Sequence, residues 1–135
     1  MVSDSFSFGM PSIKKKKEKK KSWYVKELDR VFSLFIRNRD RGICASCGVK
    51  KDISEMQCGH YISRSHMSTR WDEENCHCQC VGCNVFKGGN YPAYTVFLQD
   101  KYGEGFPKVL YRRGQEIKQL SIKELKEKIE HYVVR

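Results

Sequence analysis

The sequence predicts an α+β fold, in which helices flank a small cysteine-rich centre held together by a metal ion. The centre contains two Cys-x-x-Cys pairs, Cys44/Cys47 and Cys80/Cys83, and the residues between them lack helical periodicity. On both sides of this centre, apolar residues recur at the spacing of amphipathic helices. Small, loop-rich segments of this kind need a metal ion to fold. A length of 135 residues is that of one domain.

The first helix is expected to begin at residue 22, after a lysine-rich tail. Residues 1–21 have no apolar periodicity and carry seven lysines, so we expect them to be disordered. Ser22 is a suitable N-cap, and an apolar face follows at helical spacing from Leu28 to Ile36. Gly42 suits the end of this helix. Residues 22–135 would then form the single folded domain.

Short strands are expected within the cysteine-rich centre. The sequence places them around residues 55–57 and 61–63, with His60 at or near the second strand. Residues 43–83 lack helical periodicity and are rich in Cys, Gly and polar residues.

Three helical patterns follow the second cysteine pair. The first begins near Asn84, is interrupted by a Gly-Gly pair, resumes at Pro92 and ends at Gly103. A short helix is expected over residues 107–113. The last helix begins with a capping box, Ser121-Ile122-Lys123-Glu124. Its expected apolar stripe consists of Ile122, Leu125, Ile129 and Val133.

Charge and composition restrict the partners and the compartment. The formal net charge is +10 and the pI is about 9.3, which favours a polyanionic partner such as nucleic acid. No apolar run approaches the length of a membrane span, and no secretory signal is visible, so we expect a cytoplasmic protein. In a reducing compartment, seven cysteines indicate metal ligands or free thiols rather than disulfides.

The cysteines allow two assignments of zinc. In the preferred one, Cys44, Cys47, Cys80 and Cys83 bind one structural zinc ion, because two Cys-x-x-Cys turns complete a tetrahedral sulfur site. The other three cysteines are then small buried residues or spare thiols. The competing assignment has two zinc ions. It groups Cys44, Cys47, Cys58 and His60 in one site and Cys76, Cys78, Cys80 and Cys83 in another.

The order of these motifs resembles a known family. Cys-x-x-Cys, Gly-His, Asn and Cys-x-x-Cys-Asn-x-x-Lys follow one another as in the zinc-knuckle branch of the His-Asn-His (HNH) nucleases, which have a ββα-metal core. Three stretches narrow the resemblance to the phage NinG (Rap) recombination proteins. They are Cys58-Gly59-His60-Tyr61-Ile62-Ser63-Arg64, Thr69-Arg70-Trp71-Asp72-Glu73-Glu74-Asn75, and His77-x-Gln79-Cys80-x-x-Cys83-Asn84.

The resemblance implies a role for three residues. His60 matches the general base that activates water against a phosphodiester. Asn75 matches the middle Asn, which orients that base or supports the metal. Asn84 stands where the last His or Asn of the motif binds the catalytic ion, Mg²⁺ or Mn²⁺.

One position departs from the wider superfamily. Many relatives have an Asp ligand directly before the catalytic His, where this chain has Gly59. His77 is the best substitute ligand, and His66, Asp72 and Glu73 are weaker ones. Side chains close to the site in sequence are candidates for phosphate binding. They are Arg64, Arg70, Lys87 and, in the tail, Lys14, Lys15, Lys16 and Lys17. For Tyr61 and Trp71, packing in the core is the favoured interpretation.

The resemblance therefore implies an endonuclease that hydrolyses branched DNA, such as Holliday junctions. Two cuts resolve a four-way junction, so a homodimer would suit this reaction. The alternative is a non-enzymatic zinc-ribbon protein that binds single-stranded or branched DNA as a recombination accessory. A third interpretation is a zinc-stabilised adaptor whose helices bind protein.

Overall fold

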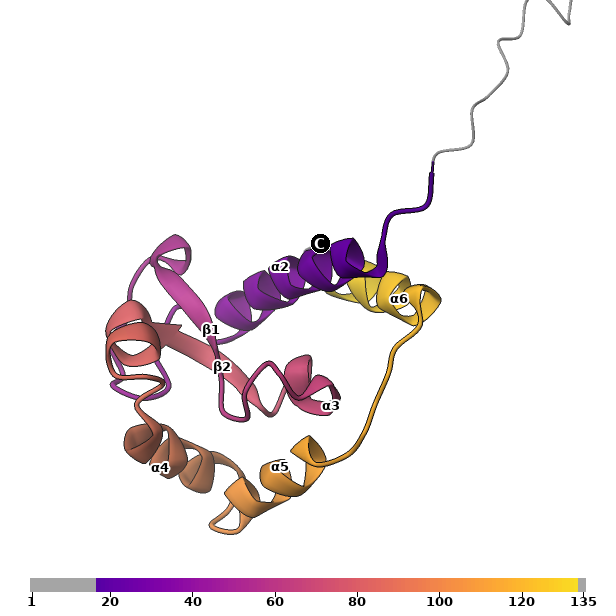
Figure 1. Cartoon of the computed structure of the whole chain (residues 1–135). Coiled ribbons are helices and arrows are strands. Elements are labelled where there is room, and N and C mark those ends of the chain that lie inside the picture. The colour runs from indigo at the N-terminus through magenta and orange to yellow at the C-terminus, as the bar shows by residue number, and fades with distance from the viewer. Residues whose placement is uncertain (1–16, 134–135) are drawn as a thin grey trace, which may run out of the picture.

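The computed structural model describes residues 17–133, in which a β-hairpin lies between two groups of helices (Figure 1). The elements, in chain order, are α2 (Lys21–Arg39), the 3-10 turn η1 (Ile53–Glu55), β1 (Met56–His60), α3 (Met67–Arg70), β2 (Cys76–Cys80), the π-helical turn η2 (Gly82–Phe86), α4 (Tyr91–Tyr102), α5 (Phe106–Gly114) and α6 (Ile122–Tyr132). The predicted α+β class is confirmed. Within this part of the chain, no helix is long and apolar enough to cross a bilayer.

Helix α2 supplies the largest share of the core. The predicted apolar face is confirmed, since Leu28, Phe32 and Ile36 are buried. The predicted N-cap is wrong, because α2 already begins at Lys21 and places Ser22 inside its first turn. Of the predicted disordered tail, the first 16 residues lie outside the described part of the chain.

Helix α6 packs along α2 (Figure 1). Its predicted capping box is confirmed: the Ser121 hydroxyl accepts from the backbone N–H of Glu124, and the Glu124 carboxylate accepts from that of Ser121. At the other end Tyr132 is buried, and its ring centroid lies 4.9 Å from that of Phe32. The predicted stripe is wrong at Val133, which is half-exposed, because Tyr132 takes the buried position there.

Strands β1 and β2 form an antiparallel hairpin, with Met56 opposite Cys80 and His60 opposite Cys76. The first expected strand is confirmed in part, whereas the second is wrong: residues 61–63 form a loop, and the partner strand is Cys76–Cys80. All five residues of β2 are buried. A strand that is covered on both faces has no alternation of apolar and polar residues, so its sequence gives no strand signal.

Helix α4 lies on the hairpin face opposite α2, and α5 packs against α4 and α3. Helix α4 ends at Gly103 as expected, and α5 matches the helix expected over residues 107–113. The expected helix from Asn84 is instead the turn η2, which starts two residues earlier. Its interruption falls at Gly88-Gly89 as expected, and both glycines have positive φ angles.

Candidate functional site

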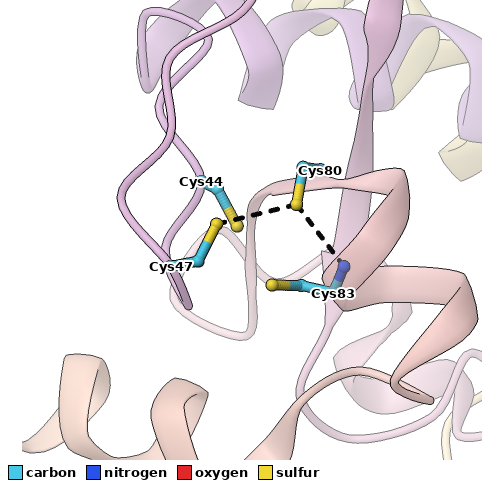
Figure 2. A group of neighbouring side chains, drawn as sticks. All are labelled: Cys44, Cys47, Cys80 and Cys83. Atoms are coloured by element: carbon cyan, nitrogen blue, oxygen red, sulfur yellow. Dashed lines mark hydrogen bonds between the residues drawn. The ribbon is translucent and has the colours of Figure 1, made fainter.

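Four cysteines from three segments meet at one end of the hairpin (Figure 2). Cys44 and Cys47 come from the loop between α2 and β1, Cys80 ends β2, and Cys83 lies in η2. Their sulfur atoms all lie within 4.8 Å of one another, and those of Cys47 and Cys80 are 3.7 Å apart. A tetrahedron of sulfurs around zinc has edges of about 3.8 Å, given zinc–sulfur bonds of about 2.3 Å. These four residues, the cysteine tetrad, could therefore bind zinc, as the preferred assignment expected.

Hydrogen bonds hold the turns of the tetrad and reach two of its sulfur atoms. The first pair sits in a tight turn, in which the N–H of Gly48 donates to the carbonyl of Cys44 over 2.8 Å. In the second pair, the N–H of Cys83 donates to the sulfur of Cys80 over 3.4 Å. The Asn90 amide donates to the sulfur of Cys83, also over 3.4 Å. Such N–H donors stabilise thiolates.

The thiols of the tetrad differ in their readiness to ionise. Burial raises the pKa of Cys44, but hydrogen bonds from backbone N–H groups outweigh it and bring the value to about 7. Burial raises the pKa of Cys83 to about 12, although the Asn90 amide opposes it. One thiolate therefore forms near neutral pH, and a divalent cation would supply the charge that the remaining thiolates need.

A cavity of about 570 Å³ runs along β1, between α2 and η2. We call it the His60 cavity. Its lining includes Asp29 and Arg37 of α2, His60 of β1, Arg64 of the following loop, and Asn84 of η2. Two of the three residues with an implied catalytic role, His60 and Asn84, therefore share one cavity with two arginines.

The ring of His60 is held in one orientation. Its Nε2 lies 2.8 Å from the backbone carbonyl oxygen of Arg70. A carbonyl only accepts hydrogen bonds, so Nε2 carries the hydrogen and Nδ1 keeps its lone pair. Burial lowers the pKa of His60, and the positive charge of Arg64 lowers it further, while the bond to the Arg70 carbonyl opposes this. The imidazole is thus neutral at physiological pH.

The carbonyl that orients His60 is itself fixed by an ion pair. The guanidinium of Arg70 donates two hydrogen bonds to Asp29, with lengths of 3.0 and 2.5 Å. Asp29 also accepts from the indole N–H of Trp71 over 2.9 Å. Trp71 is buried, as expected. Arg70 was a candidate for phosphate binding, but its side chain instead ties the loop before β2 to α2.

Asn75 is completely buried and holds the loop between the strands. Its side-chain oxygen accepts from the N–H of Ile62 over 2.8 Å. Its amide nitrogen donates to the carbonyls of Ile62 and Thr69, both over 3.0 Å. The middle Asn therefore closes the loop that carries Arg70, and it positions His60 through that loop rather than by direct contact.

Gly59 stands directly before His60, where many HNH nucleases have an Asp, and it has no room for a side chain. A Cβ atom at this position would overlap the side chain of Gln79 on the paired strand. The Gln79 amide is anchored there, because it donates to the Ser46 hydroxyl and to the Gly89 carbonyl, each over 2.8 Å. The absence of an Asp ligand thus follows from the packing on this face of the hairpin.

The structure places the expected substitute, His77, away from the His60 cavity. It pairs with Gly59 and points toward α4, where its two ring nitrogens lie 3.0 and 2.9 Å from the hydroxyls of Tyr94 and Tyr102. Burial, helped by the charge of Arg39, lowers the pKa of His77 to about 3. Its position is that of a neutral core histidine. Asn84 does line the cavity, and its amide donates to the Gln57 side chain over 2.7 Å.

The weaker ligand candidates are engaged elsewhere. His66 bonds the Gly114 carbonyl, Asp72 pairs with Arg113, and Glu73 accepts from Tyr132. None of the three lines the His60 cavity. The carboxylate that does line it, Asp29, has no signal in the sequence, because it lies 41 residues from Arg70 and comes from a helix outside the motifs.

The candidate phosphate-binding side chains are mostly on the surface. Arg64 is exposed and reaches Asp29 over 3.9 Å at the edge of the cavity. Lys87 is exposed just after η2, and Lys17 is exposed ahead of α2. The other three tail lysines, Lys14, Lys15 and Lys16, lie outside the described residues.

The structure does not group the cysteines as the two-zinc assignment does. Between residues 17 and 133, it brings together the cysteine tetrad and a second group, Cys58, His60 and Cys76. Cys78 is buried between them and belongs to neither group. The preferred assignment expected Cys58 and Cys76 to be small buried residues or spare thiols. Cys76 is buried, and the strand register places both cysteines beside His60.

Comparison with known proteins identifies the family. Residues 10–135 match the family model described as Bacteriophage Lambda NinG protein. The proteins named ninG of Salmonella phage P22 and Escherichia phage lambda are 38% and 36% identical over 93 and 94 residues. These matches cover 67% and 68% of this chain but 45% and 46% of the relatives, so the chain spans about half the length of the curated relatives it matches. No solved structure matches. The family match spans almost the entire chain, and the protein belongs to the NinG family.

Proposed function

We propose that this chain is a metal-dependent DNA endonuclease of the HNH type that acts on branched DNA. The observation that carries the proposal is the state of His60. Its ring faces a cavity, its Nε2–H is fixed on the Arg70 carbonyl, and its Nδ1 keeps a lone pair. This is what a general base needs, and a lowered pKa keeps the base neutral near pH 7. Such a base contributes roughly 10²–10⁴-fold to the rate.

The order of elements around His60 supports an HNH-type core. His60 ends β1, a loop closed by Asn75 leads into β2, and a helical turn carrying Asn84 follows. The tetrad joins the start of that turn to the loop before β1. These positions correspond to the His, the middle Asn and the last Asn of the motif that the sequence resembles.

A hard cation completes the proposed site. Among the residues that line the His60 cavity, the Asn84 amide and the Asp29 carboxylate offer it oxygen ligands of the kind that Mg²⁺ and Mn²⁺ prefer. Mg²⁺ commonly keeps several waters and takes only one or two protein ligands, so this small set fits it. When bound, the ion would stabilise the charge on the leaving oxygen.

Charge supports DNA as the substrate. The chain carries a net charge of +10, and Arg37 and Arg64 line the cavity in which His60 lies. Lys87 and the tail from Lys14 to Lys17 would add contacts to phosphates that do not depend on base sequence. The preference for branched DNA comes from the family resemblance, as does the homodimer that two symmetric cuts would suit.

Cutting of a labelled four-way junction in Mg²⁺ or Mn²⁺ tests the proposal. We expect the wild type, with zinc in its cysteine tetrad and excess zinc removed, to cut, and His60→Ala to lose at least about 100-fold in rate while it still binds the junction. His131→Ala is the matched control, because His131 is exposed on α6, outside the cavity. Its rate should equal that of the wild type.

Two outcomes would contradict the proposal. If the folded wild type binds the junction but cuts no form of DNA with any divalent ion, the non-enzymatic DNA-binding alternative holds. If its affinity for DNA is absent at low salt as well as at high salt, the adaptor interpretation holds, because a DNA-binding protein loses affinity steeply as salt rises.

A further inference from the structure

We propose that Cys58, His60 and Cys76 form a second metal site, which takes a thiophilic ion such as Zn²⁺ or Cd²⁺. The three side chains offer ligand atoms that all lie within 4.8 Å of one another. The hairpin register produces this arrangement. Cys58 and His60 are two residues apart on β1 and therefore share a face, and Cys76 stands directly opposite His60 on β2. The group is separate from the cysteine tetrad.

The surroundings of His60 match those of a metal-bound histidine. Metal-binding histidines almost always donate their other ring N–H to a carboxylate, a backbone carbonyl or water, which fixes the tautomer. The bond of 2.8 Å from Nε2 to the Arg70 carbonyl does this. It leaves the Nδ1 lone pair available for an ion. The Asp29–Arg70 ion pair in turn fixes the residue that supplies the carbonyl.

The donor set and its exposure indicate the class of ion. Two sulfurs and one imidazole suit Zn²⁺ and Cd²⁺ and do not suit Mg²⁺, which prefers oxygen. Three protein ligands leave a fourth position open, as in zinc sites that exchange a water or a substrate. Cys76 is fully buried, whereas Cys58 and His60 line the His60 cavity, so the ion would enter from that side.

An ion at this site would change the chemistry of the cavity. It would take the Nδ1 lone pair that the proposed nuclease uses to accept a proton. Zinc would therefore inhibit the nuclease, whereas Mg²⁺ would not compete for the thiols. This consequence rests on the proposed function, but the existence of the site does not.

Cadmium binding by the full chain tests the site directly. After saturation with Cd²⁺ and removal of excess ion, elemental analysis should give two ions per chain. Cadmium NMR should show two resonances, one from a four-sulfur site and one from a site with two sulfurs and a nitrogen. Cys58→Ala and His60→Ala should each bind one ion and keep only the four-sulfur resonance. That remaining resonance also shows that the variants still fold around the tetrad.

Cys78→Ala is the matched control, because Cys78 lies on the same strand as Cys76 but in neither group. It should keep both ions. One ion per wild-type chain, or two ions in Cys58→Ala and in His60→Ala, would overturn the proposal. If Cys58→Ala loses both resonances, it no longer folds around the tetrad, and the ion count of His60→Ala then tests the proposal.

The effect on catalysis has its own readout. Junction cutting in Mg²⁺ is measured at rising zinc concentrations, and each protein's rate is divided by its own rate without zinc. The zinc concentration that halves this rate should be at least about 10-fold higher for Cys58→Ala than for the wild type. Even the loss of an outer contact weakens metal sites 10–100-fold. An equal zinc sensitivity of wild type and variant would refute the inhibition. If the wild type does not cut at all, the nuclease proposal fails while the ion count still decides the metal site.

Discussion

Asn75 gives the sharpest test of how the loop between the strands is held. The change Asn75→Ala removes the three hydrogen bonds that its side chain makes to Ile62 and Thr69. Each contributes about 1 kcal/mol net, and the amide is completely buried. We therefore expect the free energy of unfolding to fall by about 3 kcal/mol.

Urea denaturation at a fixed excess of zinc measures this loss. With a urea dependence of about 1–3 kcal/mol per M for a domain of this size, the midpoint should fall by roughly 1–3 M. Asn38→Ala is the control, because the Asn38 side chain is exposed and donates to the Leu34 carbonyl of its own helix. It should change the stability by less than about 0.5 kcal/mol.

Under the proposed function, the same variant should lose nuclease activity beyond what its loss of stability explains. The loop that Asn75 closes also carries the Arg70 carbonyl on which His60 is oriented. A displacement of about 1 Å in a catalytic group can cost about 100-fold in rate. We expect a loss of this size in junction cutting under conditions where the variant is still folded. A stability within 1 kcal/mol of the wild type, together with an unchanged rate, would refute this account of Asn75.

Three further predictions concern the residues that support the site. Cys47→Ser, at the exposed member of the tetrad, should abolish the four-sulfur site in elemental analysis and remove the sharp urea transition, because metal binding and folding are coupled. Gly59→Ala should lower the free energy of unfolding by about 2–4 kcal/mol, because the new Cβ overlaps the anchored Gln79 side chain. The same change should lower it by less than about 1 kcal/mol when Gln79→Ala is already present. Additive losses in this double-mutant cycle would refute the overlap. Asp29→Ala should lower the free energy of unfolding by about 2–3 kcal/mol in urea denaturation, because it leaves a largely buried guanidinium without its carboxylate partner. Loss of Glu27, the partner of the exposed Arg30, should leave the midpoint unchanged.

Local signals were sufficient for the helices and for the tetrad. The apolar face of α2, the capping box of α6 and the glycine at the end of α4 each depend on residues within a few positions of one another. The Cys-x-x-Cys turn is similarly local, and two such turns have few ways to complete a tetrahedral site. These features could be predicted because the interactions that stabilise them lie within one turn or one helix.

The remainder of the site depends on contacts between distant residues. Strand β2 reads Cys-His-Cys-Gln-Cys, which has no apolar alternation, because α2 and α4 cover its two faces. Histidine is a common metal ligand, but His77 lies on the hairpin face that α4 covers, where its ring contacts Tyr94 and Tyr102. Asp29 reaches the loop before β2 across 41 residues. No pattern in the sequence relates these residues until the hairpin register is known.

The strand register also connects the cysteine tetrad with His60. Cys80 and His60 stand at opposite ends of a ladder of five paired positions, about 14 Å apart along the strands at 3.4 Å per residue. The tetrad fixes Cys80, and the Asp40 carboxylate fixes the middle of β2 by accepting from the N–H of Cys78 over 2.8 Å. A slip of one residue would turn His60 away from its cavity and Gly59 away from Gln79. The cysteine tetrad therefore orients His60 without touching it, by setting which residues of the two strands face each other.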